Sequence, residues 1–304
     1  MKKVKKIIKI KHQSKISKSS KENKIHNNLS ILLENTHDQA LKRRAFNIIE
    51  NLNLKGDERI LDAGCGDGYY LKLLLNLYPD LEIYGVDIDT KALDVAYKNL
   101  ASELNNKKLT ITKESINKLN FEDNFFDAAF STEVLEHVPN DLEALNEIKR
   151  VLKPNGIYIF TVPNYNFPFM WDPLNFILQK FFNSHIKSGF FAGIWNQHIR
   201  LYTIDNLVEK VAKAEMKIEK IKSITHYSLP FNHYILNLGA RILHDTNLIS
   251  KESNYNKFQM KKIKRNNFSL IGFYNLFVSL VDRKNDNIDS SYSSVSLFFK
   301  IKKI

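Results

Sequence analysis

The sequence predicts a doubly wound α/β domain built on a mostly parallel sheet. Between residues 38 and 163, short apolar runs alternate with segments whose apolar residues recur at helical spacing. Three glycines occupy positions 64–68, directly after the first apolar run, and the carboxylates Asp62 and Asp87 lie near the ends of the first two runs. Continuous apolar strands joined by helices are typical of a parallel sheet that is covered on both faces.

The individual elements follow from these patterns in chain order. Apolar residues at helical spacing predict helices over 38–52, 70–78, 90–104 and 141–152. Apolar runs predict strands over 58–64, 81–89, 108–115, 126–132, 156–163, about 216–224 and 293–303. Pro79 ends the second helix, and Asp89 or Thr90 caps the third. Pro154 and Gly156 end the fourth, and Asn155 between them can take a left-handed conformation.

The glycine-rich stretch after the first strand predicts a ligand site. In a doubly wound sheet, ligands bind beyond the carboxyl ends of the strands at the switch point. The spacing is G-x-G-x-G, with Tyr69 where a dinucleotide fingerprint would have its third glycine. Asp87, at the end of the second strand, suits the hydroxyls of a ribose. The alternative is a tight turn in which glycine serves packing only.

Charge is distributed unevenly along the chain. Residues 1–28 carry ten Lys and one Glu, residues 29–160 carry 15 basic and 22 acidic residues, and residues 161–304 carry 20 and 10. Basic ends around an acidic middle favour an anionic partner, although a generally lysine-rich composition would give the same counts. We expect residues 1–28 to be a basic tail that is disordered or loosely helical. The single cysteine, Cys65, excludes an internal disulfide and favours a cytoplasmic compartment.

Four stretches together resemble one enzyme family. LDAGCGDG, GVDID, FDAAFSTEVLEHV and LKPNGIYIFTVPN are similar to class I S-adenosylmethionine-dependent methyltransferases, most of all the ubiquinone-biosynthesis O-methyltransferase type. The resemblance covers about residues 38–165 and returns at 198–221. It implies a seven-stranded Rossmann-like methyltransferase sheet over residues 29–304, with helical insertions at about 164–199 and 226–290.

The resemblance also implies which residues bind S-adenosylmethionine. Asp87 would bind the ribose and Ile88 would pack on the adenine. Ser115 and Ile116 would lie near the adenine amino group. The full set of implied cofactor residues is Asp62, Gly64, Cys65, Gly66, Gly68, Asp87, Ile88, Ser115, Ile116, Ser131 and Thr132.

Methyl transfer requires mainly that the acceptor be aligned with the methyl group, because a sulfonium methyl group is already activated. If the acceptor is a hydroxyl, a general base assists, and the candidates are Glu133, His137 and His198. Glu133, Glu136 and His137 have a spacing that would place them on one helical face. The resemblance implies that these three bind Mg²⁺. The alternative is that Glu136 and His137 serve local structure.

The insertions predict where the acceptor binds. Residues 161–304 hold 23 of the 35 aromatic residues. Within 166–195 an apolar stripe predicts an amphipathic helix, formed by Leu174, Ile177, Leu178, Phe181 and Phe182. It could form a lid over the acceptor, lie in a membrane interface, or simply cover the core. The apolar run between Arg265 and Asp282 is too short for a membrane span.

The expected activity is methyl transfer to a small or lipid-like acceptor, through oxygen, by a cytoplasmic protein that binds anionic membrane peripherally. One alternative is an RNA or protein methyltransferase recruited by the basic tail. Nucleic acid is disfavoured, since STEV at 131–134 stands where base-modifying relatives have an Asn/Asp-Pro-Pro-aromatic stretch. A second alternative is a non-catalytic module that only binds S-adenosylmethionine.

Overall fold

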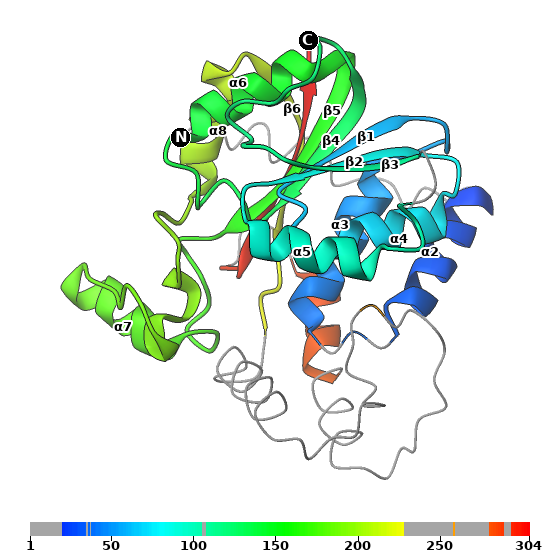
Figure 1. Cartoon of the computed structure of the whole chain (residues 1–304). Helices are drawn as coiled ribbons and strands as arrows, with labels where there is room; N and C mark the ends of the chain where they lie inside the picture. Colours follow the sequence, from blue (N-terminus) through cyan, green and yellow to red (C-terminus); the bar gives the residue numbers. More distant parts are fainter. Residues whose placement is uncertain are drawn as a thin grey trace.

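The computed structural model describes residues 20–34, 36, 38–104, 108–227, 258, 280–288 and 293–304. Its centre is a seven-stranded sheet in the order β3-β2-β1-β4-β5-β7-β6 (Figure 1). The strands are β1 (Arg59–Ala63), β2 (Glu82–Asp87), β3 (Leu109–Lys113), β4 (Phe126–Thr132), β5 (Leu152–Pro163), β6 (Met216–Ile224) and β7 (Ser296–Lys303). Strands β1 to β5 are parallel, and β7 is antiparallel to both β5 and β6. The expected seven-stranded, mostly parallel sheet is confirmed.

The sheet has its switch point between β1 and β4. The chain runs outward from β1 to β3 on one side and returns to β4 on the other. Asp62 of β1 pairs with Gly85 of β2 and with Phe130 of β4. The carboxyl ends of these three strands therefore lie side by side, which is where a doubly wound sheet binds its ligand.

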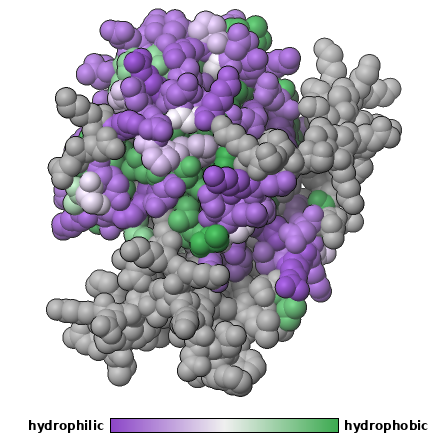
Figure 2. All heavy atoms as spheres, turned by 90° about the vertical axis from the view of Figure 1, so that its right-hand side faces the viewer, coloured by the Kyte–Doolittle hydropathy of each residue, from purple (hydrophilic) through white to green (hydrophobic). Residues whose placement is uncertain are grey.

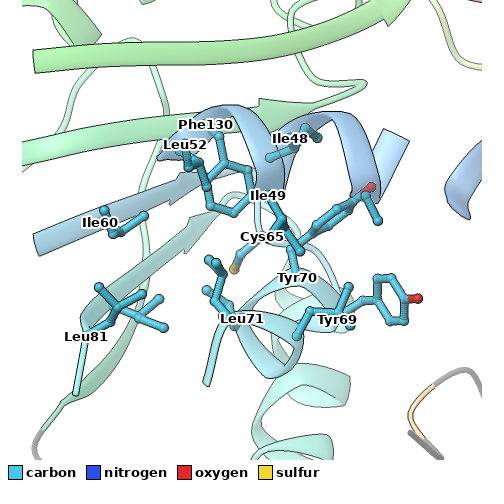
Figure 3. Close-up of a cluster of buried hydrophobic side chains, with 14 of the residues drawn as sticks. Ile48, Ile49, Leu52, Ile60, Cys65, Tyr69, Tyr70, Leu71, Leu81 and Phe130 are labelled. Atoms are coloured by element: carbon cyan, nitrogen blue, oxygen red, sulfur yellow. The ribbon is translucent and has the colours of Figure 1, made fainter. Parts of the chain in front are cut away.

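Helices cover both faces of the sheet (Figure 1). One face carries α2 (Ser20–Leu32), α3 (Gln39–Leu52), α4 (Tyr69–Leu77) and α5 (Thr90–Asn99). The other carries α6 (Asp141–Val151) and α8 (Ile204–Lys213). Figure 3 shows the core on the first face, where aliphatic side chains of α3 and α4 meet Ile60 and Phe130 of the sheet.

Two residues at the ends of helices, Asp89 and Asn155, have the hydrogen bond or backbone conformation that the sequence predicts. Asp89 caps α5 by accepting a hydrogen bond from the Lys91 N–H. Asn155 has a φ of 66°, the expected left-handed conformation. Its neighbour Gly156 has no room for a side chain, because an added Cβ would lie 2.8 Å from the Lys153 carbonyl oxygen.

The N-terminal region differs from the expected disordered or loosely helical tail, because part of it is a helix that packs on the core. Helix α2 begins at Ser20, and its residue Leu29 is fully buried, as is the following Leu33. The boundary expected at residue 28 lies inside α2 and is therefore wrong, while residues 1–19 lie outside the described part of the chain.

The face of the described residues seen in Figure 2 is largely hydrophilic, with hydrophobic side chains gathered near its centre.

The insertion after β5 forms α7 (Pro173–Phe182) and a 3₁₀ segment, η2 (Phe190–Trp195). Helix α7 projects away from the sheet (Figure 1). Its buried residues are Pro173 and Asn175, whereas the apolar stripe faces outward: Phe181 and Phe182 are each 69% exposed. The stripe therefore does not serve as an ordinary core-covering face.

Most of the second expected insertion, 226–290, lies outside the described residues, including the apolar run before Asp282. The described part contains a short 3₁₀ segment, η3 (Arg283–Asn287). None of the described helices has both the length and the hydrophobicity needed to cross a membrane.

Candidate active site

The glycine-rich turn leaves β1 at the switch point and leads into α4. Gly64, Gly66 and Gly68 all have positive φ values, of 95°, 52° and 82°. A Cβ on Gly64 would lie 2.3 Å from Val134 Cγ2, and one on Gly68 would lie 2.6 Å from Leu100 Cδ1. At Gly66 an added Cβ would meet nothing within 4 Å. Two of the three glycines are thus needed for packing as well as conformation, while Gly66 borders open space.

Asp87 is held by backbone donors at the end of β2. Its Oδ2 accepts a hydrogen bond from the Gly66 N–H at 2.8 Å, and its Oδ1 accepts one from the Asp89 N–H at 2.9 Å. Each carboxylate oxygen has a second lone pair available for a ligand. Ile88, next in the chain, is 67% exposed, so its apolar side chain is accessible to a ligand.

Two of the other residues expected at the cofactor, Cys65 and Ser131, have buried side chains. Cys65 points into the core beside Leu71 and Tyr70 (Figure 3), and burial raises the pKa of its thiol. Ser131 is buried, and its hydroxyl lies 2.6 Å from that of Tyr158. The sequence did not reveal these inward orientations.

Ser115, Ile116 and Thr132 complete the expected cofactor set. Ser115 Oγ accepts a hydrogen bond from the Asn117 N–H at 3.3 Å, and Ile116 is buried in the core beneath α6. Thr132 ends β4 and is half-buried. The Ser115 hydroxyl is thus used within its own turn.

A group of buried polar side chains meets near the carboxyl ends of β1 and β4. Neither carboxylate oxygen of Asp62 has a hydrogen-bond partner among the described residues, nor do Tyr70 Oη, Arg44 Nε and Glu133 Oε1. Burial, reinforced by Asp87 and Asp67, raises the pKa of Asp62 well above its usual range. Buried polar groups are rarely left unpaired, so this group marks a place where a polar ligand belongs.

Arg44 supplies a positive charge to this group and was not anticipated. Its Nη1 lies 3.3 Å from Glu133 Oε2. Burial is the largest single effect and disfavours its charge, but the surrounding groups, Glu133 foremost, together outweigh burial and raise the pKa of Arg44. The sequence contained a signal: Arg44 is four residues from both Ala40 and Ile48, which are buried, so it lies on the apolar face of α3.

The segment after β4 is a turn, not the expected helix. Glu133 has a φ of 54°, a left-handed conformation that is strained for a residue other than glycine. Its N–H donates to the Thr161 carbonyl at 2.9 Å. Glu133 and Glu136 therefore do not share a helical face with His137. One carboxylate oxygen of Glu133 pairs with Arg44, and the group of described side chains close enough to share a metal ion contains Glu136 and His137 but not Glu133.

Glu136 and His137 instead meet His198. Glu136 Oε1 lies 3.8 Å from His198 Nε2 and 4.0 Å from His137 Nε2. The two imidazole rings have centroids 4.8 Å apart. Glu136 is fully buried with neither carboxylate oxygen hydrogen-bonded among the described residues, and burial, followed by the charge of Glu133, raises its pKa well above the usual range.

Hydrogen bonds to backbone carbonyls of the turn after β4 hold His198 beside Glu136. The Ile199 N–H donates to the Glu136 carbonyl at 3.0 Å, and Arg200 donates to the carbonyls of Val138 and Pro139, each at 2.8 Å. Tyr202 Oη donates to the Leu135 carbonyl at 3.0 Å. Arg200 and Tyr202 thus fasten the segment before α8 to the turn after β4.

Comparisons with known proteins agree with this geometry. Residues 61–160 match a family described as "Methyltransferase domain". The sterol 24-C-methyltransferase of Aspergillus fumigatus is 31% identical over 121 residues, covering 40% of this chain and 32% of that protein. The malonyl-[acyl-carrier protein] O-methyltransferase of Legionella pneumophila is 30% identical over 118 residues, covering 39% of this chain and 40% of that protein. The chain thus spans well under half the length of these relatives.

Solved structures with the same fold extend over most of the chain. Phosphoethanolamine N-methyltransferase 2 of Haemonchus contortus, in complex with S-adenosyl-L-methionine, has a TM-score of 0.52 and 21% identity, covering 86% of this chain and 52% of that one. The [4+2]-cyclase SpnF has a TM-score of 0.54 and 16% identity, covering 86% of this chain and 80% of that one. At these identities the likeness concerns the fold. Residues 61–160 therefore form a methyltransferase domain, within the fold of class I S-adenosylmethionine-dependent methyltransferases.

Proposed function

We propose that this protein transfers a methyl group from S-adenosylmethionine to the oxygen of a small or lipid-like acceptor. The observation that carries the proposal is the group of unpartnered buried polar atoms of Asp62, Tyr70, Arg44 and Glu133 beside the glycine-rich turn. A polar ligand with both a cationic and an anionic end would satisfy this group. The amino-acid part of S-adenosylmethionine carries an ammonium and a carboxylate.

The proposed cofactor site divides between the two ends of the ligand. Asp62 would accept from the ammonium and Arg44 would donate to the carboxylate. Asp87, held in place by Gly66 and Asp89, would accept from both ribose hydroxyls. The exposed side chain of Ile88 would pack on the adenine.

The remaining proposed cofactor residues would contribute mainly through their backbones. Gly64 and Gly68 would shape the turn, and Cys65 would line it with its peptide group because its side chain is in the core. Backbone atoms of Ser115 and Ile116 would approach the adenine amino group. Ser131 and Thr132 would approach the methionine part from the end of β4.

The proposed catalytic residues lie beyond the end of β4. When bound, the cofactor supplies an activated methyl group, so the protein must align the acceptor and remove its proton. Glu133, His137 and His198 are the candidates for that proton transfer. His137 is the most accessible of the three, with a side chain 40% exposed.

We further propose that the protein works at the inner face of an anionic membrane. A sterol methyltransferase and an O-methyltransferase of an acyl-carrier protein are among its relatives, which supports a lipid-like acceptor. Helix α7 presents Phe181, Phe182 and Ile177 to solvent. The segment 164–199 contains one acidic residue, Asp172, and two lysines, Lys180 and Lys187. Asp172 is fully buried and both lysines are exposed, so this segment presents positive charge to an anionic surface.

Incubation with S-adenosylmethionine labelled on its methyl group tests the activity. The full chain is mixed with a lipid extract and, separately, with a water-soluble metabolite extract, and labelled products are identified by mass spectrometry. We expect a labelled O-methyl product, formed more slowly by Asp87→Ala when S-adenosylmethionine is limiting. Calorimetry that detects no S-adenosylmethionine binding would overturn the proposal. Binding without any labelled product would favour a non-catalytic module.

A further inference from the structure

We propose that Glu136, His137 and His198 bind one divalent transition-metal ion of the zinc class through one carboxylate oxygen and the two Nε2 atoms. Each of the three residues offers one ligand atom, and these atoms all lie within 4.8 Å of one another. The set is distinct from the Mg²⁺ set that the sequence resemblance implied. It includes a histidine from a segment 61 residues away and omits Glu133, which is the proposed proton acceptor that stays available when the ion is bound.

The distances favour a shared cation over direct hydrogen bonds. Separations of 3.8 and 4.0 Å from Glu136 Oε1 to the two Nε2 atoms are too long for hydrogen bonds. Around a tetrahedral ion with bonds of about 2.0 Å, ligand atoms are about 3.3 Å apart. The two separations from Glu136 must shorten by about 0.5 and 0.7 Å, and the separation of the two imidazole ligand atoms, which lie within 4.8 Å of one another, by at most about 1.5 Å. Side-chain rotations can supply shifts of this size.

Glu136 is the first independent sign of a missing cation. Its carboxylate is fully buried, and neither oxygen has a hydrogen-bond partner among the described residues. An unpaired buried carboxylate is costly, so such groups are paired, protonated or bound to a metal. Two imidazoles that converge on the same oxygen make metal binding the best match.

His137 is the second sign, because its other ring nitrogen is already committed. His137 Nδ1 lies 2.9 Å from the Gln197 carbonyl oxygen. A carbonyl only accepts, so Nδ1 carries the hydrogen, and the neutral ring presents a lone pair at Nε2. A histidine fixed by a carbonyl in this way is the usual arrangement for a metal ligand.

The donor set determines the kind of ion. Mg²⁺ prefers oxygen ligands in a near-ideal octahedron. Two imidazoles and one carboxylate suit Zn²⁺, Co²⁺, Ni²⁺ or Fe²⁺, and three protein ligands leave a coordination position open. His137 is exposed at the surface, which gives the ion a path of entry.

Titration of the untagged, chelator-treated full chain with Zn²⁺ by calorimetry tests the inference. We expect one ion per chain, no comparable binding of Mg²⁺, and a rise in visible absorption when Co²⁺ replaces Zn²⁺. His198→Ala and Glu136→Gln should each weaken Zn²⁺ binding by more than the about 100-fold that loss of an outer-shell partner can cost. His26→Ala is the matched control, because His26 contacts Glu50 in a surface His–Glu pair that is outside this cluster.

The inference is overturned if the unmodified chain binds no Zn²⁺, if it prefers Mg²⁺, or if His198→Ala binds Zn²⁺ as the unmodified chain does. Circular dichroism establishes that each variant is folded, and the unmodified chain decides the question even if Glu136→Gln does not fold. The titration requires neither methyl donor nor acceptor. Its failure is therefore distinguishable from failure of the proposed methyl transfer.

Discussion

Asp87 and Gly66 are joined by a 2.8 Å hydrogen bond from the Gly66 N–H to the Asp87 carboxylate. This bond ties the end of β2 to the turn that leaves β1. It orients the carboxylate before any ligand arrives, and such preorganisation reduces the cost of binding.

Asp87→Ala should therefore weaken S-adenosylmethionine binding by about 1–3 kcal/mol, since the ribose hydroxyls lose their acceptor. Asp87→Asn should weaken it less, because one oxygen acceptor remains. Isothermal calorimetry measures both. Unchanged affinity in Asp87→Ala would mean that the ribose lies elsewhere.

The glycines of the turn give a second prediction, because they differ in the space around them. Gly64→Ala would force a Cβ to 2.3 Å from Val134 Cγ2, so we expect loss of both stability and cofactor binding. Gly66→Ala meets nothing in the ligand-free protein, so its stability should fall by only about 1–2 kcal/mol for the left-handed backbone. Its cofactor affinity should nevertheless fall sharply if the ligand fills that space.

Gly56→Ala is the control for this comparison. Gly56 also has a positive φ with nothing within 4 Å of an added Cβ, but it precedes β1 and is remote from the turn. Thermal denaturation and calorimetry of the three variants separate backbone strain from steric exclusion. Equal cofactor affinity in the variants of Gly66 and Gly56 would argue against a ligand beside Gly66.

The features that the sequence predicted well are those set by local patterns. Strand and helix periodicity, the cap at Asp89 and the left-handed Asn155 depend on neighbouring residues only. The glycine-rich turn was recognisable for the same reason. Both the sheet and the position of the site within it could be predicted from these features.

The features that the sequence did not predict depend on distant contacts. The spacing of Glu133, Glu136 and His137 fits a helix, but a bond to the Thr161 carbonyl and the packing of Val134 against Gly64 enforce a turn. Similarly, the apolar stripe of α7 predicted a helix but not its orientation. Asn175 is buried instead, because its amide donates to Asp172 and to the Phe191 carbonyl.

Asp62 predicts a pH dependence of stability. Burial raises its folded-state pKa above the model-compound value of 3.8. Its stabilising contribution is therefore present below that value and is lost as the pH rises through the raised pKa. Asp62→Asn cannot ionise, so from about pH 5 to about pH 8 its free energy of unfolding should fall less than that of the unmodified chain.

Urea denaturation of the two ligand-free proteins at both pH values measures this difference. The raised pKa of Glu136 acts in the same direction in both proteins and so cancels in the comparison. Parallel changes with pH would show that Asp62 ionises as readily in the folded protein as in the unfolded chain.

Helix α2 determines how the basic N-terminal segment can be tested. Residues 1–19 hold eight lysines and precede the helix, whereas Leu29 is fully buried. Deletion of residues 1–19 should preserve the melting temperature and turnover of a small acceptor, while Leu29→Ala should cost about 2–5 kcal/mol of stability. If the deletion abolished methylation of RNA but not cofactor binding, the RNA alternative would gain support.

Helix α7 gives the prediction for membrane binding. Phe181 and Phe182 are exposed beside Lys180, so aromatic rings and a cation would meet the lipid interface together. The double variant Phe181→Asp/Phe182→Asp should lose co-sedimentation with vesicles that contain anionic lipid. The control double variant Ile31→Asp/Val95→Asp adds the same charge at exposed apolar positions of α2 and α5 and should retain co-sedimentation.

The electrostatic part of membrane binding should also weaken as salt rises, because exposed charges are screened within about 10 Å at 0.1 M. Equal sedimentation of the two double variants would show that α7 is not the contact, and sedimentation independent of both anionic lipid and salt would remove the membrane proposal altogether.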